Sequence, residues 1–154
     1  MIRPAVSGLI HGTSVAFDLG PRLAAVLITG RPGSGKSELA LELMAMGAVL
    51  VADDQTRLER RGDRVILSAP PVLRGLIEMR GIGLLRAVSQ DEAPLELLID
   101  LDTVETERLP APHWHLLEGC RIPLLRKCAS RAFAAAIRQY VIAGHWQEGE
   151  ADPS

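Results

Sequence analysis

The chain reads LAAVLITGRPGSGKSELALELMAMGAVLVADD over residues 23–54, and this stretch decides the fold. Its first part, Leu23–Thr29, is almost wholly apolar, which is typical of a strand covered on both faces. Ser37–Met46 contains good helix formers, with apolar residues spaced by four and three. Ala48–Ala52 predicts a second buried strand. The sequence therefore predicts a strand, loop, helix and strand in succession, and an α/β fold.

The loop between the first strand and the helix matches G-x-x-x-x-G-K-[ST], the pattern of a phosphate-binding loop, or P-loop. Glycines let successive backbone N–H groups approach phosphate oxygens, and the start of the helix adds partial positive charge. We expect Lys36 to reach the β- and γ-phosphates of ATP, and the Ser37 hydroxyl to bind Mg²⁺. The residues expected to hold the nucleotide are Gly30, Arg31, Pro32, Gly33, Ser34, Gly35, Lys36 and Ser37.

Further elements are expected on both sides of this unit. Thr13–Leu19 alternates apolar residues with smaller or polar ones and is followed by Gly20-Pro21, which predicts a strand and a turn. The other predictions are a hairpin of Thr56–Arg60 and Arg64–Ser68, a short helix Val72–Met79, a strand Leu95–Leu101, and an amphipathic helix Cys128–Ala143 that ends at Gly144.

The composition is that of one ordinary globular domain, with 154 residues, 47% of them hydrophobic, and a net charge of −2. It excludes collagen-like and wholly disordered proteins, and its charge offers no general attraction to nucleic acid or to an anionic membrane. No apolar run approaches the roughly 18 residues that span a bilayer, and the first residues lack the apolar core of a secretory signal. Cys120 and Cys128 do not have the spacing of a disulfide framework or a zinc site. We expect a cytoplasmic protein with reduced thiols.

Two pairs of acidic residues follow predicted strands: Asp53 with Asp54, and Asp100 with Asp102. Ligands of open α/β sheets gather at the carboxyl ends of the strands, so either pair is a candidate for the site. Adjacent side chains on an extended strand point to opposite faces, so Asp53 and Asp54 should have different roles. The spacing does not decide which pair faces the phosphates.

The sequence pattern around the histidines does not by itself indicate a catalytic or metal-binding role. His11 stands alone before the first predicted strand, as structural and exposed histidines often do. His113 and His115 are expected on one face of a strand, yet no third ligand stands at the spacing of a metal site.

Three segments, in this order, carry a family resemblance: HGTSVAFDLG at 11–20, VLITGRPGSGKSELALELMAMGAVLVADD at 26–54 and LIEMRGIGLL at 76–85. Together they resemble the catalytic domain of bacterial HPr kinase/phosphorylase. That family phosphorylates a serine on HPr, the phosphocarrier protein of the sugar phosphotransferase system. The resemblance implies a P-loop-containing α/β core similar to that of phosphoenolpyruvate carboxykinase, with a mixed sheet and flanking helices. It also implies a homo-oligomer, a hexamer in the family, with an HPr-like protein as substrate.

The resemblance also implies catalytic roles for four residues. Lys36 matches the P-loop lysine, and Asp54 matches the residue that accepts the proton in phosphorylation and donates it in the reverse reaction. His11 matches a histidine that assists this aspartate. Arg108, in ETERLP, matches a later catalytic arginine.

The metal ligands implied by the resemblance are Ser37 and Glu78, and Arg80–Gly83 matches a stretch important for both directions of the reaction. The family's Pro/Gly/Arg loop, associated with dephosphorylation, corresponds here to IPLLRKCASRAFA at 122–134, which lacks the glycine and the second proline. Phosphorolytic reversal therefore stays open.

The chain resembles a short form that consists of the C-terminal catalytic domain alone. We expect an N-terminal extension at residues 1–9, a single kinase domain at 10–146 and a flexible tail at 147–154. Two alternatives to a protein kinase remain at this point. One is a non-catalytic module that senses ATP, and the other is a small-metabolite kinase with the same P-loop.

Overall fold

A computed structural model of the chain describes residues 4–6 and 8–145. Within these residues, ten strands form one mixed sheet, and two further strands form a separate hairpin. The strands of the large sheet are β1 (Pro4–Val6), β2 (Leu9–His11), β3 (Thr13–Asp18), β4 (Leu23–Thr29), β5 (Val49–Ala52), β6 (Gln55–Arg61), β7 (Arg64–Ser68), β10 (Glu92–Val104), β11 (His113–Leu117) and β12 (Cys120–Lys127). The hairpin consists of β8 (Leu76–Met79) and β9 (Gly83–Arg86). The helices are α1 (Lys36–Ala45), α2 (Phe133–Ala143) and a short 3₁₀ turn at Pro71–Leu73.

The predicted central unit is confirmed: β4 leads through the loop into α1, and α1 leads into β5. Strand β4 lies between β3, to which it is antiparallel, and β10, to which it is parallel. The order along the main path of the sheet is β1-β2-β6-β7-β10-β4-β3-β5, with β12 on β10 and β11 on β12. The expected mixed sheet with flanking helices is therefore confirmed.

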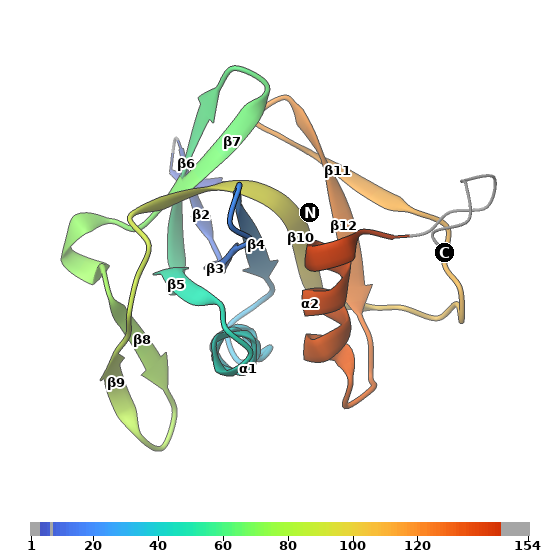
Figure 1. The fold of residues 1–154 in the computed structure, drawn as a ribbon. Coiled ribbons are helices and arrows are strands. Elements are labelled where there is room, and N and C mark those ends of the chain that lie inside the picture. Colours follow the sequence, from blue (N-terminus) through green and yellow to red (C-terminus); the bar gives the residue numbers. More distant parts are fainter. Residues whose placement is uncertain (1–3, 7, 146–154) are drawn as a thin grey trace.

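Both faces of the central strands are covered, as the apolar sequence of β4 predicts. Helices α1 and α2 lie side by side on one face (Figure 1), where they pack on Val26 and Ile28. Ala25 and Leu27 point to the opposite face, into a second core cluster with residues of β6, β7, β11 and β12. Because side chains alternate along a strand, every side chain from Ala24 to Ile28 is buried.

Strand β10 joins the two parts of the sheet (Figure 1). Its first residues, Glu92–Pro94, pair antiparallel with β7, and its later residues pair parallel with β4 and β12. A register shift against β4 separates Leu95 from Leu97, and these two residues belong to opposite core clusters. The result is that Asp100 lies beside Thr29, the last residue of the P-loop strand.

Two predicted helices differ from the structure. The segment Val72–Met79 is not a helix: the 3₁₀ turn is followed by β8, in which the buried Ile77 lies between more exposed neighbours. The C-terminal helix begins at Phe133 instead of Cys128, because residues up to Lys127 belong to β12. It ends at Gly144 as expected.

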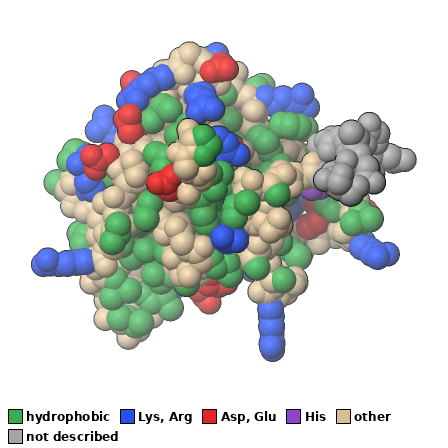
Figure 2. Space-filling view, in the orientation of Figure 1, with side chains coloured by type: hydrophobic (Ala, Val, Ile, Leu, Met, Phe, Trp, Pro, Cys, Tyr) green, Lys and Arg blue, Asp and Glu red, His purple; other side chains and the backbone are tan. Residues whose placement is uncertain are grey.

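Large apolar side chains are exposed on and beside the β8–β9 hairpin. Ile82 and Leu84 are 71% and 68% exposed, and Val72 and Val88 are more exposed still. Figure 2 shows hydrophobic side chains gathered in the region where Figure 1 places this hairpin. Of the helices in the described part of the chain, none has the length and apolar character needed to cross a membrane.

Candidate active site

The P-loop connects the end of β4 to the start of α1. Lys36, the first residue of α1, donates hydrogen bonds from Nζ to the carbonyl oxygens of Gly30 at 2.8 Å and Arg31 at 3.3 Å. A lysine ammonium has three N–H donors, so one remains for a phosphate oxygen. The first backbone N–H groups of α1 have no partner within the helix and face the same region as its positive dipole end.

The loop is compact on its inner side. A Cβ atom at Gly30 would lie 2.5 Å from Ser34 Oγ, so this position tolerates only glycine in this conformation. Ser34 turns its hydroxyl inward, where Oγ is buried without a hydrogen-bond partner among the described residues. The Ser34 N–H donates to the carbonyl oxygen of Arg31 at 3.0 Å and closes the turn.

Asp53 is the hydrogen-bonding centre of the site. Its Oδ1 accepts hydrogen bonds from the hydroxyls of Ser37 at 2.7 Å and Thr13 at 2.9 Å, and its Oδ2 accepts one from the backbone N–H of Glu78 at 2.9 Å. The side chain is buried, and three donors from three separate elements compensate its loss of water. Asp53 therefore fastens the P-loop serine to β3 and to the β8–β9 hairpin.

Asp54 has a different conformation and surroundings. Its φ of +64° is in the left-handed region, which aspartate tolerates better than most residues. Its backbone N–H donates to Thr13 Oγ1 at 3.2 Å, and its carbonyl oxygen accepts a hydrogen bond from the N–H of Gly12 at 2.8 Å. The backbone is thus held on both sides while the residue stays exposed. The two acids have different surroundings, but not for the expected reason: β5 ends at Ala52, so neither lies on an extended strand, and their different roles stay a prediction.

Two hollows meet at Lys36 and Asp54, which line both. The larger has a volume of about 600 Å³. Its other polar or charged lining residues include His11, Arg31, Asp100, Asp102 and His115. The smaller, of about 290 Å³, is lined also by Gly33, Gly35, Ser37, Asp53, Glu78 and Arg80. The P-loop therefore lies between two hollows that share its lysine and the exposed aspartate.

The smaller hollow offers ligands suited to a hard divalent cation. Ser37, Asp53 and Glu78 supply hydroxyl and carboxylate oxygens, which Mg²⁺ prefers. Within the described residues, no group of three or more His, Cys, Asp or Glu side chains is arranged to hold a metal ion. Magnesium commonly uses one or two carboxylates together with substrate phosphates and water, so the donor set fits this ion.

His11 lines the larger hollow at the end of β2, where the connection to β3 passes close to β4. The adjacent Gly12 is buried, and a Cβ atom there would lie 2.9 Å from Leu27 Cδ1 and 3.0 Å from the carbonyl oxygen of Ile28. A side chain at position 12 would therefore displace its neighbours on β4, and the close approach leaves the exposed His11 in the same hollow as Asp54.

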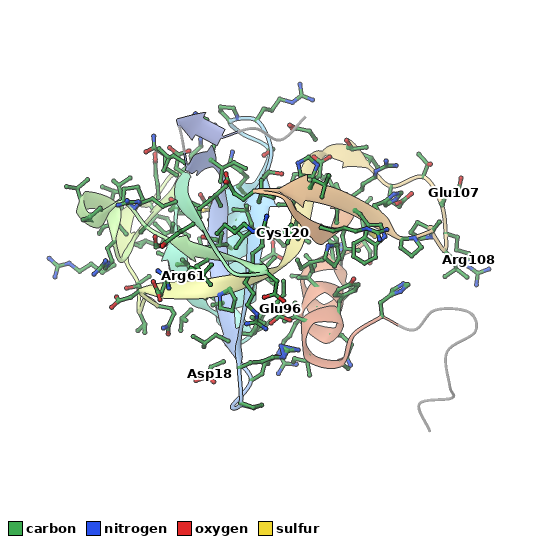
Figure 3. All side chains as sticks on the ribbon, turned by 90° about the horizontal axis from the view of Figure 1, so that it is seen from above. Asp18, Arg61, Glu96, Glu107, Arg108 and Cys120 are labelled. Atoms are coloured by element: carbon green, nitrogen blue, oxygen red, sulfur yellow. The ribbon has the colours of Figure 1, made fainter. Side chains whose placement is uncertain are left out.

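Arg108 is not brought to this site within the single chain. It lies between β10 and β11, where it lines a separate cavity with α2 residues such as Phe133 and Tyr140. Figure 3 shows Arg108 and Glu107 at the outer edge of the molecule. The other residues predicted to be catalytic, to hold the nucleotide or to bind the metal, except Ser34, line one or both of the hollows, and of the stretch Arg80–Gly83 only Arg80 does.

The structure also separates the two rival acid pairs. Asp53 contacts the P-loop serine, whereas Asp102 contacts the second residue of the loop through the N–H of Arg31. This hydrogen bond is the main cause that lowers the pKa of Asp102, and the Arg31 and Lys36 charges add to it. Sequence reasoning missed Thr13, which holds both Asp53 and Asp54, because no motif marks a threonine 40 residues before the acid it contacts.

Comparison with known proteins shows which family the chain resembles. The family model of the HPr serine kinase C-terminal domain matches residues 6–109. The HPr kinase/phosphorylase of Nitrosomonas europaea is 38% identical over 138 residues, which are 76% of this chain and 43% of that protein. That of Alkaliphilus metalliredigens is 44% identical over 85 residues, which are 50% of this chain and 28% of that protein.

A solved structure, that of the HPr(Ser) kinase/phosphatase from Coxiella burnetii, matches with a TM-score of 0.71 and 25% sequence identity. The match covers 86% of this chain and 93% of the solved one. The chain spans less than half the length of the two curated relatives. Because the family model covers well over half of the sequence, the chain belongs to the HPr serine kinase C-terminal domain family.

Proposed function

We propose that this chain is an ATP-dependent protein-serine kinase whose substrate is an HPr-like phosphocarrier protein. One observation carries the proposal: Asp54 lines, together with Lys36, both hollows beside the P-loop. A group that accepts a proton must lie within reach of the reacting hydroxyl, and a P-loop lysine marks where the γ-phosphate lies. The relatives are HPr kinase/phosphorylases, and this likeness supports the same substrate.

In this mechanism the P-loop amides, Gly30 to Ser37, and the remaining N–H donor of Lys36 hold the phosphates of ATP. A serine oxygen of the partner forms a bond to the γ-phosphorus, and the bond from that phosphorus to the β–γ bridging oxygen breaks, so that ADP leaves. Asp54 accepts the proton of the serine hydroxyl. His11, in the same hollow, would assist Asp54.

We assign the metal to the smaller hollow, with Ser37 and Glu78 as its protein ligands. Bound Mg²⁺ would neutralise charge on the β- and γ-phosphates. Asp53 would act through Ser37, since it already accepts the Ser37 hydroxyl at 2.7 Å. Arg108 would reach the reaction only from another copy of the chain or after the 105–112 segment moves, because in the single chain it lines a different cavity.

We further propose that the kinase domain comprises residues 10–146, with β1 as an added outer strand, and that the protein is cytoplasmic and homo-oligomeric. The tail expected at 147–154 lies outside the described residues. Phosphorolytic reversal, the attack of inorganic phosphate on the phosphoserine, belongs to the same site and is tested separately.

To test the proposal, the protein is incubated with Mg·ATP and HPr, and the mass of HPr is measured by intact-mass spectrometry. The proposal expects one added phosphate, located on serine. In the Asp54→Asn variant we expect phosphotransfer to fall by about 10²- to 10⁴-fold while nucleotide affinity is kept. Asparagine tolerates the left-handed backbone at this position, so the variant should fold.

Three results would contradict the proposal. A wild-type protein that binds ATP but never phosphorylates HPr would favour a nucleotide-sensing module. Transfer to a small hydroxylated metabolite, with HPr unmodified, would favour a metabolite kinase. Full transfer by the Asp54→Asn variant would remove Asp54 from the mechanism.

A further inference from the structure

Asp102 is not part of the P-loop motif, but its side chain contacts the P-loop. Its Oδ1 accepts hydrogen bonds from the backbone N–H of Arg31 at 3.0 Å and from the Arg31 guanidinium Nε at 3.4 Å. The two residues are 71 positions apart, so only the fold brings them together. Parallel pairing of β10 with β4 does this, because it aligns the end of β10 with the beginning of the loop.

Arg31 belongs to two peptide groups, and the carbonyl oxygen of each, that of Gly30 and that of Arg31, accepts a hydrogen bond from Lys36 Nζ. The carbonyl oxygen of Arg31 accepts hydrogen bonds from Lys36 Nζ at 3.3 Å and from the Ser34 N–H at 3.0 Å. Its N–H, on the other side of the residue, is the one held by Asp102. A shift of Arg31 would therefore displace a hydrogen-bond acceptor of Lys36 and the carbonyl that closes the turn with the Ser34 N–H.

Asp102 is itself fixed. Its backbone N–H donates to Asp100 Oδ1 at 2.9 Å, which turns the end of β10. The result is a continuous series of hydrogen bonds from Asp100 through Asp102 and Arg31 to Lys36. A charged acceptor makes a hydrogen bond to a backbone N–H roughly twice as strong as a neutral one does.

We propose that Asp102 is a positioning residue for nucleotide binding, which holds the Arg31 peptide so that Lys36 meets the phosphates. The proposal rests on the proposed function only in taking ATP as the nucleotide. Asp53 fastens the Ser37 end of the loop, and Asp102 fastens the Arg31 end. One acid of each pair, Asp53 and Asp102, thus holds one end of the loop.

The experiment measures the Kd of the Mg²⁺ complex of a non-hydrolysable ATP analogue by calorimetry. We expect Asp102→Ala, which removes both hydrogen bonds, to raise Kd about tenfold. Asp102→Asn keeps a neutral acceptor oxygen and should raise Kd about threefold. Asp18→Asn is the matched control, since Asp18 also accepts a hydrogen bond from a backbone N–H, that of Gly20, at the opposite end of β4. The control should bind like wild type.

Two additional measurements separate positioning from a general structural role. In phosphotransfer assays, Asp102→Ala should raise the KM for ATP and leave kcat at saturating ATP near the wild-type value. Asp102→Ala should also weaken binding in an Arg31→Ala background, because residue 31 keeps its backbone N–H there. Thermal melting confirms that each variant is folded.

Wild-type affinity in folded Asp102→Ala would overturn the proposal. So would a lower kcat with an unchanged KM for ATP, or a loss that vanishes in the Arg31→Ala background. If Asp102→Ala does not fold, Asp102→Asn decides alone, and a wild-type Kd for that variant overturns the proposal. Because binding needs no transfer, a protein that binds the analogue but phosphorylates nothing contradicts the proposed function and leaves this test intact.

Discussion

Thr13 shows how one uncharged residue organises two acidic ones. Thr13 is fully buried. Its hydroxyl donates a hydrogen bond to Asp53 Oδ1 at 2.9 Å, and the hydroxyl oxygen, Thr13 Oγ1, accepts one from the N–H of Asp54 at 3.2 Å. A hydroxyl can donate once and accept as well, so both bonds coexist. Thr13 therefore fixes the backbone of Asp54 and at the same time provides one of the three hydrogen bonds to the Asp53 carboxylate.

Replacing Thr13 by valine keeps the side-chain shape and removes both hydrogen bonds. The buried Asp53 carboxylate would lose one of its three donors, so we expect the free energy of unfolding to fall by about 2 kcal/mol. Urea denaturation measures the change. Thr106→Val, at an exposed position between β10 and β11, is the control and should change stability by less than about 0.5 kcal/mol. Equal stability of Thr13→Val and wild type would contradict this role.

Ionic contacts link neighbouring strands within the sheet. Arg61, the last residue of β6, donates to both oxygens of Glu92, the first residue of β10, at 2.7 and 2.9 Å, and to Glu59 at 2.8 Å. These hydrogen bonds are the main cause that lowers the pKa of Glu59 and of Glu92. Strand β7 lies between β6 and β10, so the contacts clamp three neighbouring strands.

This clamp should give a pH dependence of definite sign. A carboxyl group whose pKa is lower in the folded state stabilises the fold above its unfolded pKa, about 4.3 for glutamate, and this stability is lost as the pH falls through the folded value. We therefore expect Glu92→Gln to melt slightly below wild type at pH 7. The difference should shrink below about pH 4. The exposed Glu107→Gln serves as control in the same melting experiments, and a difference that grows on acidification would contradict the assignment.

Among the helices and strands, the sequence predicted those that depend on residues close together in the chain. The P-loop motif and its flanking strand and helix were correct because glycine spacing and apolar runs act within a few residues. The Val72–Met79 helix was wrong because a short apolar segment fits either a helix or a strand, and pairing with β9 decides for the strand. The contacts of Asp53 and Asp102 were not predictable, since their partners depend on strand order.

Across the whole molecule, the β8–β9 hairpin connects the site to the surface. Glu78 lines the smaller hollow, and its partner across the hairpin, Leu84, lies on the same face and is exposed. Ile82, at the turn, is also exposed. Monomeric proteins seldom leave a contiguous apolar patch of large side chains in water. The proposed homo-oligomer would cover this patch with a second copy of the chain.

The mass of the protein in solution shows whether the hairpin lies between two copies of the chain. We expect wild type to be a homo-oligomer by size-exclusion chromatography with light scattering, and Ile82→Lys with Leu84→Lys to shift the mass toward the monomer. The charges would have to be desolvated in an apolar contact, which is unfavourable. Leu116→Lys, at a 69% exposed position on β11, is the matched control and should keep the wild-type mass. An unchanged oligomer in the double variant would place the interface elsewhere, and a monomeric wild type at all concentrations would contradict the proposed assembly.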